Sequence, residues 1–149
     1  MLNHLLSWAI WLPILAGIIV ALIGSNGARA NIARWVALIG AIASFLVTLP
    51  LFSGFDRLNG GMQFTELASW IPALGLNYHL GVDGISVLLV ILNAFTTVLV
   101  VLAGWQVIQK KPAQYFAAFL IMSGLINGAF SALDAILFYA FFEGMLIPM

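Results

Sequence analysis

Long apolar runs separated by short polar segments dominate the chain, and their lengths predict membrane-spanning helices. About 20 apolar residues in a helix cross a hydrocarbon core roughly 30 Å thick. We therefore predict an all-α fold, a polytopic transmembrane helix bundle that forms a single membrane domain over residues 1–149. The predicted helices cover about residues 5–23, 32–52, 82–107, 114–131 and 134–149.

The first apolar run admits two interpretations, a cleaved signal peptide or a retained helix. Ala28-Arg29-Ala30 follows the run as a cleavage site would, but no Lys or Arg precedes the run. The run from Leu5 to Ile23 also exceeds the roughly 7–15 residues typical of the apolar segment of a signal peptide. We interpret it as a retained helix that is kinked at Pro13.

One long polar segment, residues 53–78, interrupts the helical pattern. It is rich in turn-forming residues, and its fragments 62–66 and 76–80 alternate apolar and polar residues. Such alternation is typical of half-buried strands. The segment therefore predicts a small external β-hairpin.

Small and polar residues recur on single faces of the predicted helices. Small residues in the second helix favour close contact with a neighbouring helix, and Gly124-x-x-x-Gly128 adds a close-packing motif to the fourth. The polar stripes of the third and fourth helices predict either a polar pathway or helix packing, and we expect the fourth-helix stripe to face the bundle interior. The small residues are Ala33, Ala37, Gly40, Ala41, Ser44 and Thr48, and the stripes contain Asp83, Ser86, Asn93, Thr97 and Gly104 on the third helix and Ser123, Asn127 and Ser131 on the fourth.

The basic residues predict how the helices are oriented. Arg29 and Arg34 lie between the first two helices, and Lys110 and Lys111 lie between the third and fourth. The positive-inside rule assigns both connections to the cytoplasmic side. We therefore expect the N-terminus and the loop 53–80 to lie outside.

Glu143 is the acidic residue that penetrates the membrane most deeply. If the last helix enters near Asp134, a rise of about 1.5 Å per residue carries Glu143 roughly 13 Å inward. An ionised acid at a helix centre costs about 2.5–3.5 kcal/mol, so such a residue is usually protonated, paired or hidden. Glu143 is therefore either a proton-transfer group or a neutral acid that joins helices. Pro148 lacks an amide proton, so we also expect the Gly144 carbonyl to be a free acceptor beside this acid.

The composition agrees with a membrane protein and excludes several kinds of site. Hydrophobic residues make up 64% of the chain and charged residues 7%, with a mean hydropathy of +1.14. The net charge is zero, which gives no preference for nucleic acid. The absence of cysteine excludes disulfides, thiolate zinc sites and cysteine-ligated iron–sulfur clusters within the chain. His4 and His79 lack the spacing of a metal pair, so we expect no metal-binding or cofactor-binding residues here.

Two segments carry a resemblance to a known family. Residues Phe138 to Met149 have the sequence FYAFFEGMLIPM, and residues Tyr78 to Ser86 have the sequence YHLGVDGIS. Both closely resemble the M-type antiporter-like membrane subunit of respiratory complex I, the proton-pumping NADH:quinone oxidoreductase. The VDGIS element is shared with the L-type subunit and related antiporter chains, whereas the Glu-x-x-Leu-Ile-Pro element favours the M-type. The resemblance extends over essentially the whole chain.

The resemblance implies a translocase subunit in the bacterial cytoplasmic (inner) membrane that couples quinone reduction to proton transport. It places the family's essential glutamate on Glu143, which would pair with a lysine on helix seven. NADH, flavin, iron–sulfur clusters and quinone are expected in the rest of the complex. The implied partners are other membrane subunits, especially neighbouring antiporter-like chains, and the lipid bilayer. Because the last helix has fewer than the ~20 residues needed to span, we expect the N-terminal part of a longer protein.

Two other functions are consistent with the same residues. The chain could be a subunit of a multi-chain cation/proton antiporter or a membrane-bound hydrogenase, which share this fold; sodium-dependent pH gradients without NADH oxidation would favour that function. It could also be a structural membrane scaffold without transport. In a scaffold, replacing Glu143 with Gln would be silent, whereas bulky residues at Gly124 or Gly128 would disrupt assembly.

Overall fold

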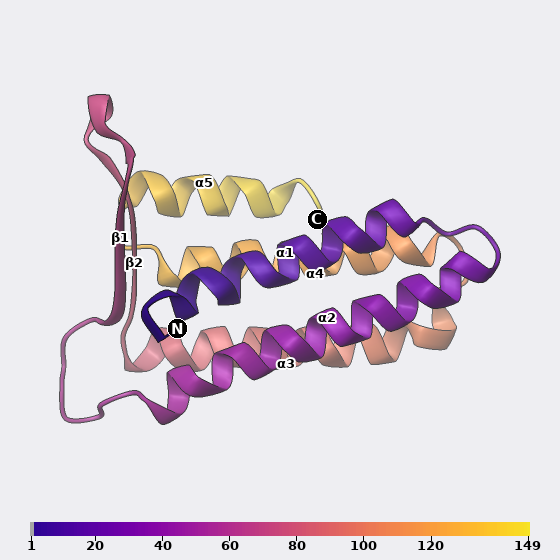
Figure 1. Cartoon of the computed structure of the whole chain (residues 1–149), viewed down its shortest axis with the longest axis horizontal. Coiled ribbons are helices and arrows are strands. Elements are labelled where there is room, and N and C mark those ends of the chain that lie inside the picture. The colour runs from indigo at the N-terminus through magenta and orange to yellow at the C-terminus, as the bar shows by residue number, and fades with distance from the viewer. Residues whose placement is uncertain (1) are drawn as a thin grey trace.

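Within residues 2–149, which the computed structural model describes, five α-helices and one β-hairpin form the fold (Figure 1). Four helices, α1 to α4, are long and apolar enough to cross a membrane, and α5 is a shorter apolar helix of 12 residues. The elements are η1 (Leu2–His4), α1 (Leu5–Ile23), α2 (Ala28–Ser53), β1 (Gln63–Ile71), η2 (Pro72–Leu74), β2 (Leu76–Val82), α3 (Gly84–Val107), α4 (Pro112–Ser131) and α5 (Ala135–Leu146).

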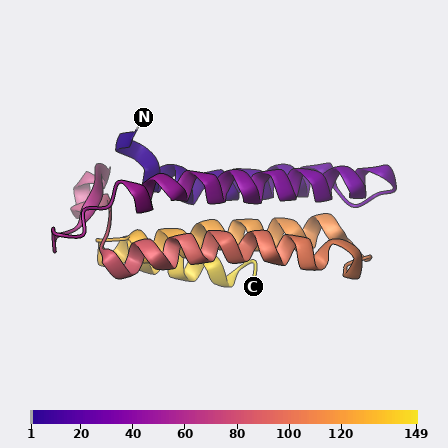
Figure 2. The same ribbon diagram turned by 90° about the horizontal axis from the view of Figure 1, so that it is seen from below.

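The helices pack in two layers, which Figure 2 shows edge-on. Helices α1 and α2 form one layer, and α3, α4 and α5 form the other. The most extensive helix contacts join α1 to α4 and α1 to α2. Helix α1 is therefore held both within its own layer and by the layer beneath it.

The two short connections lie at one end of the bundle, and the hairpin lies at the other (Figure 1). Arg34 Nη2 donates to the Ile108 carbonyl at 3.1 Å and so joins the start of α2 to the end of α3. Four of the five Lys and Arg residues belong to this end, at Arg29, Arg34, Lys110 and Lys111. Both basic connections thus share one side, which is the arrangement on which the positive-inside rule relies.

The predicted hairpin is confirmed as an antiparallel pair, β1 with β2, and its strands are longer than the fragments predicted. It stands across the ends of the helices (Figure 1). Glu66 lies opposite Leu80 in the register. At the base of the hairpin, the Leu133 amide donates to the His79 carbonyl at 2.9 Å. This bond fixes the hairpin to the connection between α4 and α5.

Small residues let the helices approach closely, as the second-helix pattern predicts. The whole small-residue face of α2 is buried. A Cβ on Gly40 would lie 2.6 Å from Ala16 Cβ, and a Cβ on Gly17 would lie 2.7 Å from Ile121 Cγ1. Real Cβ atoms do not approach so closely, so these α1–α2 and α1–α4 contacts depend on glycine. Apolar clusters surround Leu6, Ile10, Leu80 and Val90 near the hairpin, and Val20, Ala37, Phe116 and Leu120 towards the opposite end.

Several helix ends differ from the predicted bounds for local reasons. Helix α2 begins at Ala28, because its first polar turns continue the helix beyond the apolar run. Helix α3 begins only at Gly84, because β2 extends to Val82 and Asp83 caps the helix. Helix α4 begins at Pro112, since proline suits the first helical turn. Helix α5 ends at Leu146, because Pro148 has no amide to continue the hydrogen-bonding pattern.

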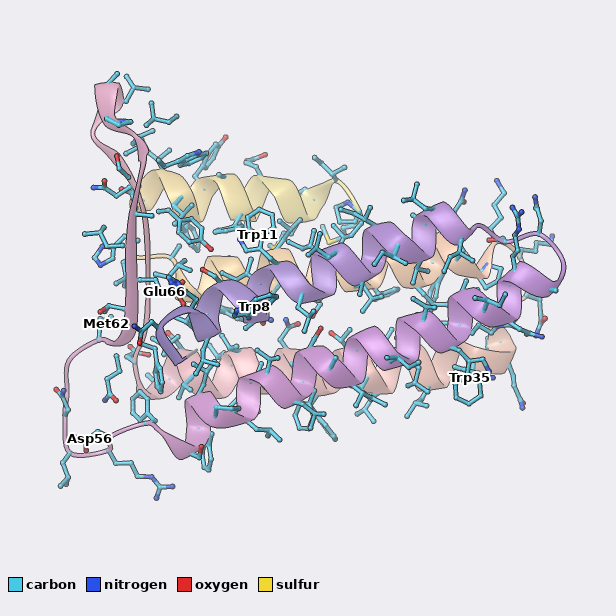
Figure 3. The ribbon with its side chains drawn as sticks, in the orientation of Figure 1. Trp8, Trp11, Trp35, Asp56, Met62 and Glu66 are labelled. Carbon is cyan, nitrogen blue, oxygen red and sulfur yellow. The ribbon has the colours of Figure 1, made fainter. Side chains whose placement is uncertain are left out.

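Tryptophans lie near both ends of the bundle (Figure 3). Trp8 and Trp11 are near the hairpin end, and Trp35 is near the basic end. Trp35 contacts Trp105 edge-on, with ring centroids 5.1 Å apart. Indole rings favour the two membrane–water boundaries, so the tryptophans are placed as a bundle crossing a bilayer would place them.

Candidate functional site

Among the residues that the structure describes, Glu143 is the only acidic one inside a helix. The other four, Asp56, Glu66, Asp83 and Asp134, lie in the loop before the hairpin, in β1 and at the caps of α3 and α5. The Asp134 carboxylate accepts hydrogen bonds from the first amides of α5. Glu143 is the ninth residue of that helix, about 13 Å further along its axis.

Glu143 lies on the face of α5 that points away from the bundle. Leu137 and Phe141, one turn apart, are the buried residues of α5. Glu143 follows Phe141 by two residues, which is about 200° around the helix, and it is exposed. Tyr139, one turn before Glu143, is also exposed. The carboxylate is therefore presented to whatever covers the outer face of α5.

The acceptor expected beside Glu143 is already used. The Ile147 amide donates to the Gly144 carbonyl at 3.3 Å, because the last turn of α5 tightens before Pro148. The prediction that Pro148 leaves this carbonyl free is therefore wrong. Pro148 ends the helix instead of supplying a polar group beside the acid.

A polar cluster of Asn93, Thr97, Ser123 and Asn127 joins α3 to α4. Asn93 Nδ2 donates to Asn127 Oδ1 at 2.8 Å and to the Ser123 carbonyl at 2.9 Å. Thr97 Oγ1 lies 2.8 Å from Ser123 Oγ. The α4 members and Ser131 are buried, which confirms that the fourth-helix stripe faces the interior.

Asn127 also binds the backbone of α1 at a place determined by Pro13. In a regular helix, the residue 13 amide would donate to the Ala9 carbonyl, but proline has no amide proton. Asn127 Nδ2 donates to that carbonyl at 3.0 Å. A carbonyl without a partner is costly in an apolar interior. The Asn127 side chain therefore links α1, α3 and α4 at one point.

A cavity of about 230 Å³ lies beside the polar cluster. Its lining includes Asn93, Thr97 and Ser123 together with apolar side chains of α3 and α4. The space exceeds the roughly 30 Å³ that one water occupies in the liquid, and the cluster supplies polar partners for water. Ser131 Oγ is buried and has no hydrogen-bond partner among the described residues.

The structure does not bring Glu143 and the polar cluster together. The cluster faces inward between α3 and α4 and reaches α1, whereas Glu143 is on the outer face of α5. A Cβ on Gly128 would lie 2.6 Å from the Phe141 ring, so the contact between α4 and α5 is closely packed and apolar. A proton path between Glu143 and the polar cluster must therefore go around this contact.

A buried carboxylate, which the sequence pattern did not indicate, lies at the hairpin end. Glu66 is only 7% exposed, and Figure 3 shows it between the hairpin and the first turn of α1. Its Oε1 accepts from the Leu6 amide at 3.0 Å and the Ser7 amide at 3.2 Å, and its Oε2 accepts from the Ser7 hydroxyl. The first amides of a helix lack partners within the helix. Glu66 therefore caps α1 from a strand about sixty residues away.

Tyr78 extends this network to β2. Its hydroxyl lies 3.1 Å from Ser7 Oγ and accepts from Trp11 Nε1 at 3.2 Å. Burial raises the pKa of the Tyr78 phenol above its ordinary value, although the hydrogen bonds with Ser7 and Trp11 oppose this shift. The phenol is therefore protonated at neutral pH and can donate to the Ser7 hydroxyl.

Two signals in the sequence could have indicated these contacts. Proline within an apolar run implies an unpaired carbonyl at Ala9, and Glu66 is the charged residue of an otherwise alternating strand. Neither signal identifies the partner. Among the described residues, no group of three His, Asp or Glu side chains could hold a metal ion.

Comparison with protein families gives one match over most of the chain. Residues 8–131 match the family described as NADH-ubiquinone oxidoreductase chain 4, amino terminus.

Individual relatives agree with that match. The chain is 45% identical to NADH-quinone oxidoreductase subunit M of Rhodobacter capsulatus over 150 residues, covering 99% of this chain and 29% of the relative. It is 38% identical to NADH-ubiquinone oxidoreductase chain 4 of Arabidopsis thaliana, covering 97% of this chain and 29% of the relative. The chain thus spans under a third of the length of these relatives.

A solved structure has the same fold. A chain of respiratory complex I from Thermus thermophilus with bound NADH superimposes with a TM-score of 0.75 at 31% sequence identity. The match covers 99% of this chain and 27% of that chain. The helix bundle with its hairpin is therefore the fold of a complex I membrane chain.

Proposed function

The chain belongs to the NADH-ubiquinone oxidoreductase chain 4 family, and from this premise we propose that it acts in a proton-translocating membrane subunit of NADH:quinone oxidoreductase. The subunit couples quinone reduction elsewhere in the complex to proton movement across the membrane. NADH, flavin, iron–sulfur clusters and quinone belong to the rest of the complex. Other membrane subunits, including neighbouring antiporter-like chains, are the proposed partners.

One observation carries the proposal: within residues 2–149, Glu143 is the sole acidic residue inside a helix, and it lies in the segment that resembles the M-type subunit. A carboxylate facing lipid at that depth would be costly, so a charged or polar partner on the outer face of α5 fits it best. A lysine from a later helix of the full-length protein is the partner that we propose. Glu143 then exchanges a proton as the charge of that lysine changes.

The polar cluster has a separate proposed role. Thr97 and Ser123 present hydroxyls to the cavity between α3 and α4, and the buried Ser131 hydroxyl lies about two turns further along α4, outside the lining of this cavity. Asn93 and Asn127 hold the helices with amide groups, which do not readily release protons. We assign the hydroxyl residues to a polar pathway, and the two asparagines and Pro148 to helix packing.

The test is Glu143→Gln in the full-length protein within its assembled complex. The variant keeps the side-chain shape but cannot ionise, so we expect proton pumping per electron to fall sharply in membrane vesicles oxidising NADH. Asp56→Asn, in the exposed loop before the hairpin, removes one carboxylate without entering a helix and is the matched control.

Assembly is checked by the amount of complex in the membrane and by NADH oxidation with an artificial electron acceptor. Unchanged proton-to-electron stoichiometry and rate in Glu143→Gln, with normal assembly, would contradict the proposal. That result would favour a scaffold in which Glu143 is a neutral packing acid.

A further inference from the structure

A groove at the hairpin end of the bundle lies between the end of α2 and the start of α3. It has a volume of about 350 Å³ and is lined by Phe52, Phe55, Arg57, Gly84, Val87 and Leu88. Phe52 and Leu88 are 48% and 54% exposed, so the groove continues into the apolar outer surface of the bundle. An apolar outer surface of this kind suits the acyl chains of lipids.

Arg57 provides a cation at the polar rim of the groove. Its guanidinium lies 5.7 Å from the centroid of the Phe52 ring, a cation–π contact. Among the described residues, its side chain makes no hydrogen bond or ion pair. The acidic neighbours are engaged with backbone amides: Asp56 accepts from Leu58, and Asp83 accepts from Ile85 and Ser86.

The location of Arg57 is unusual for this chain. The other four Lys and Arg residues lie at the opposite end, so within residues 2–149 Arg57 is the only one at the hairpin end. A cation above an apolar groove complements a molecule that has an anionic head and an apolar tail. Guanidinium groups bind phosphate oxygens through paired hydrogen bonds, and arginine stems lie readily along apolar surfaces.

We propose that this groove binds a membrane phospholipid. The phosphate meets the Arg57 guanidinium, and one acyl chain lies along Phe52, Val87 and Leu88. A soluble anion fits less well, because it gains nothing from the apolar groove. This site is independent of the proposed role of Glu143.

The experiment compares two photoactivatable lipids in membranes that carry the full-length protein in its native assembly. Phosphatidylglycerol and diacylglycerol probes share one diazirine-bearing acyl chain and differ only in the phosphate headgroup. Mass spectrometry measures adducts on peptides containing residues 52–57 and 84–88. We expect about fivefold more labelling by the phosphate-bearing probe, the effect of one basic residue near a lipid surface.

Three variants separate headgroup recognition from general contact with lipid. Arg57→Gln should abolish the preference between probes, and because Arg57 is exposed, the fold should be unaffected. Leu88→Trp should fill the groove and lower labelling by both probes. Arg29→Gln, which removes an exposed cation at the opposite end, should leave the preference unchanged. Equal labelling by both probes in the unaltered protein, a preference that survives Arg57→Gln, or no adducts in this groove would each overturn the proposal.

Discussion

A single proline determines the environment of Asn127. Pro13 removes the amide that would bond the Ala9 carbonyl, and the Asn127 amide replaces it at 3.0 Å. The same side chain accepts from Asn93, so its two ends are used by different helices. A proline inside a helix and a buried amide, 114 residues apart in sequence, therefore act as one unit.

A double-mutant cycle on Pro13 and Asn127 tests this unit. Asn127→Ala should lower the free energy of unfolding by about 1 kcal/mol, the scale of interhelical hydrogen bonds in membranes. In a Pro13→Ala background the residue 13 amide can bond the Ala9 carbonyl, so the same change should cost less. Denaturant unfolding of the purified full-length protein in micelles measures both effects.

Ser131→Ala is the control for the cycle, because the Ser131 hydroxyl is buried on the same helix but has no partner among the described residues. Ser131→Ala should change the free energy of unfolding by the same amount with and without Pro13. Strict additivity of Pro13→Ala and Asn127→Ala would show that the two residues do not interact.

At the residue scale, the sequence predicted which residues are buried better than it predicted which residues they contact. The four-residue spacing of Ser123, Asn127 and Ser131 was enough to predict that they face the interior. The depth of Glu143 followed from counting residues, but its face did not, because α5 is apolar all round and offers no contrast between its sides. The contact of Glu66 with Ser7 was not predictable, since nothing local links a strand residue with a helix start far away in the chain.

At the element scale, α1 and α4 approach so closely where they cross that only glycine fits between them. A Cβ on Gly124 would lie 2.5 Å from Ile14 Cγ1 and closer still to the Ile10 carbonyl. The backbone carbonyl cannot move away as the end of a flexible side chain could. The close-packing motif in the sequence is therefore used, but its two glycines serve different neighbours, α1 for Gly124 and α5 for Gly128.

Gly124→Ala should destabilise the bundle by about 1–3 kcal/mol, because the added methyl group forces α1 away from α4. Gly144→Ala is the matched control: its Cβ would meet Leu125 at 3.5 Å, an ordinary contact. In thermal unfolding of the full-length protein in detergent, Gly124→Ala should therefore be less stable than Gly144→Ala. Equal stability of the two would contradict the close approach of α1 and α4.

Local sequence patterns were enough to predict the helices and strands, but not where each helix begins and ends. Apolar runs predicted the helices, and alternation predicted both strands of the hairpin. The helix ends were harder to predict because caps and polar turns determine them, as Asp83 does for α3 and the polar first turns do for α2. Hydrogen bonds from the Ser86 and Ile85 amides lower the pKa of the Asp83 carboxyl, so this cap remains charged at neutral pH.

At the scale of the whole molecule, the basic end and the hairpin end define opposite sides, and the proposed orientation puts the hairpin outside. Residues 1–149 contain no cysteine, so a single cysteine introduced here, compared with the unaltered protein, can report each side. Asn59→Cys, in the loop before the hairpin, should react with a membrane-impermeant maleimide on intact cells. Asn26→Cys, between α1 and α2, should react only after the membrane is made permeable. Labelling of Asn26→Cys on intact cells would show that the orientation is the opposite of the predicted one.

The cap on α1 also has a consequence for the order of biosynthesis. The Leu6 and Ser7 amides receive their acceptor from Glu66, so α1 emerges from the ribosome with an incomplete first turn. At about 5–20 residues per second, the missing residue is synthesised roughly 3–12 s later. If the hairpin lies outside, as the basic residues predict, it must cross the bilayer before it can dock. In that orientation, the first turn of α1 gains its acceptor only after the hairpin has been translocated.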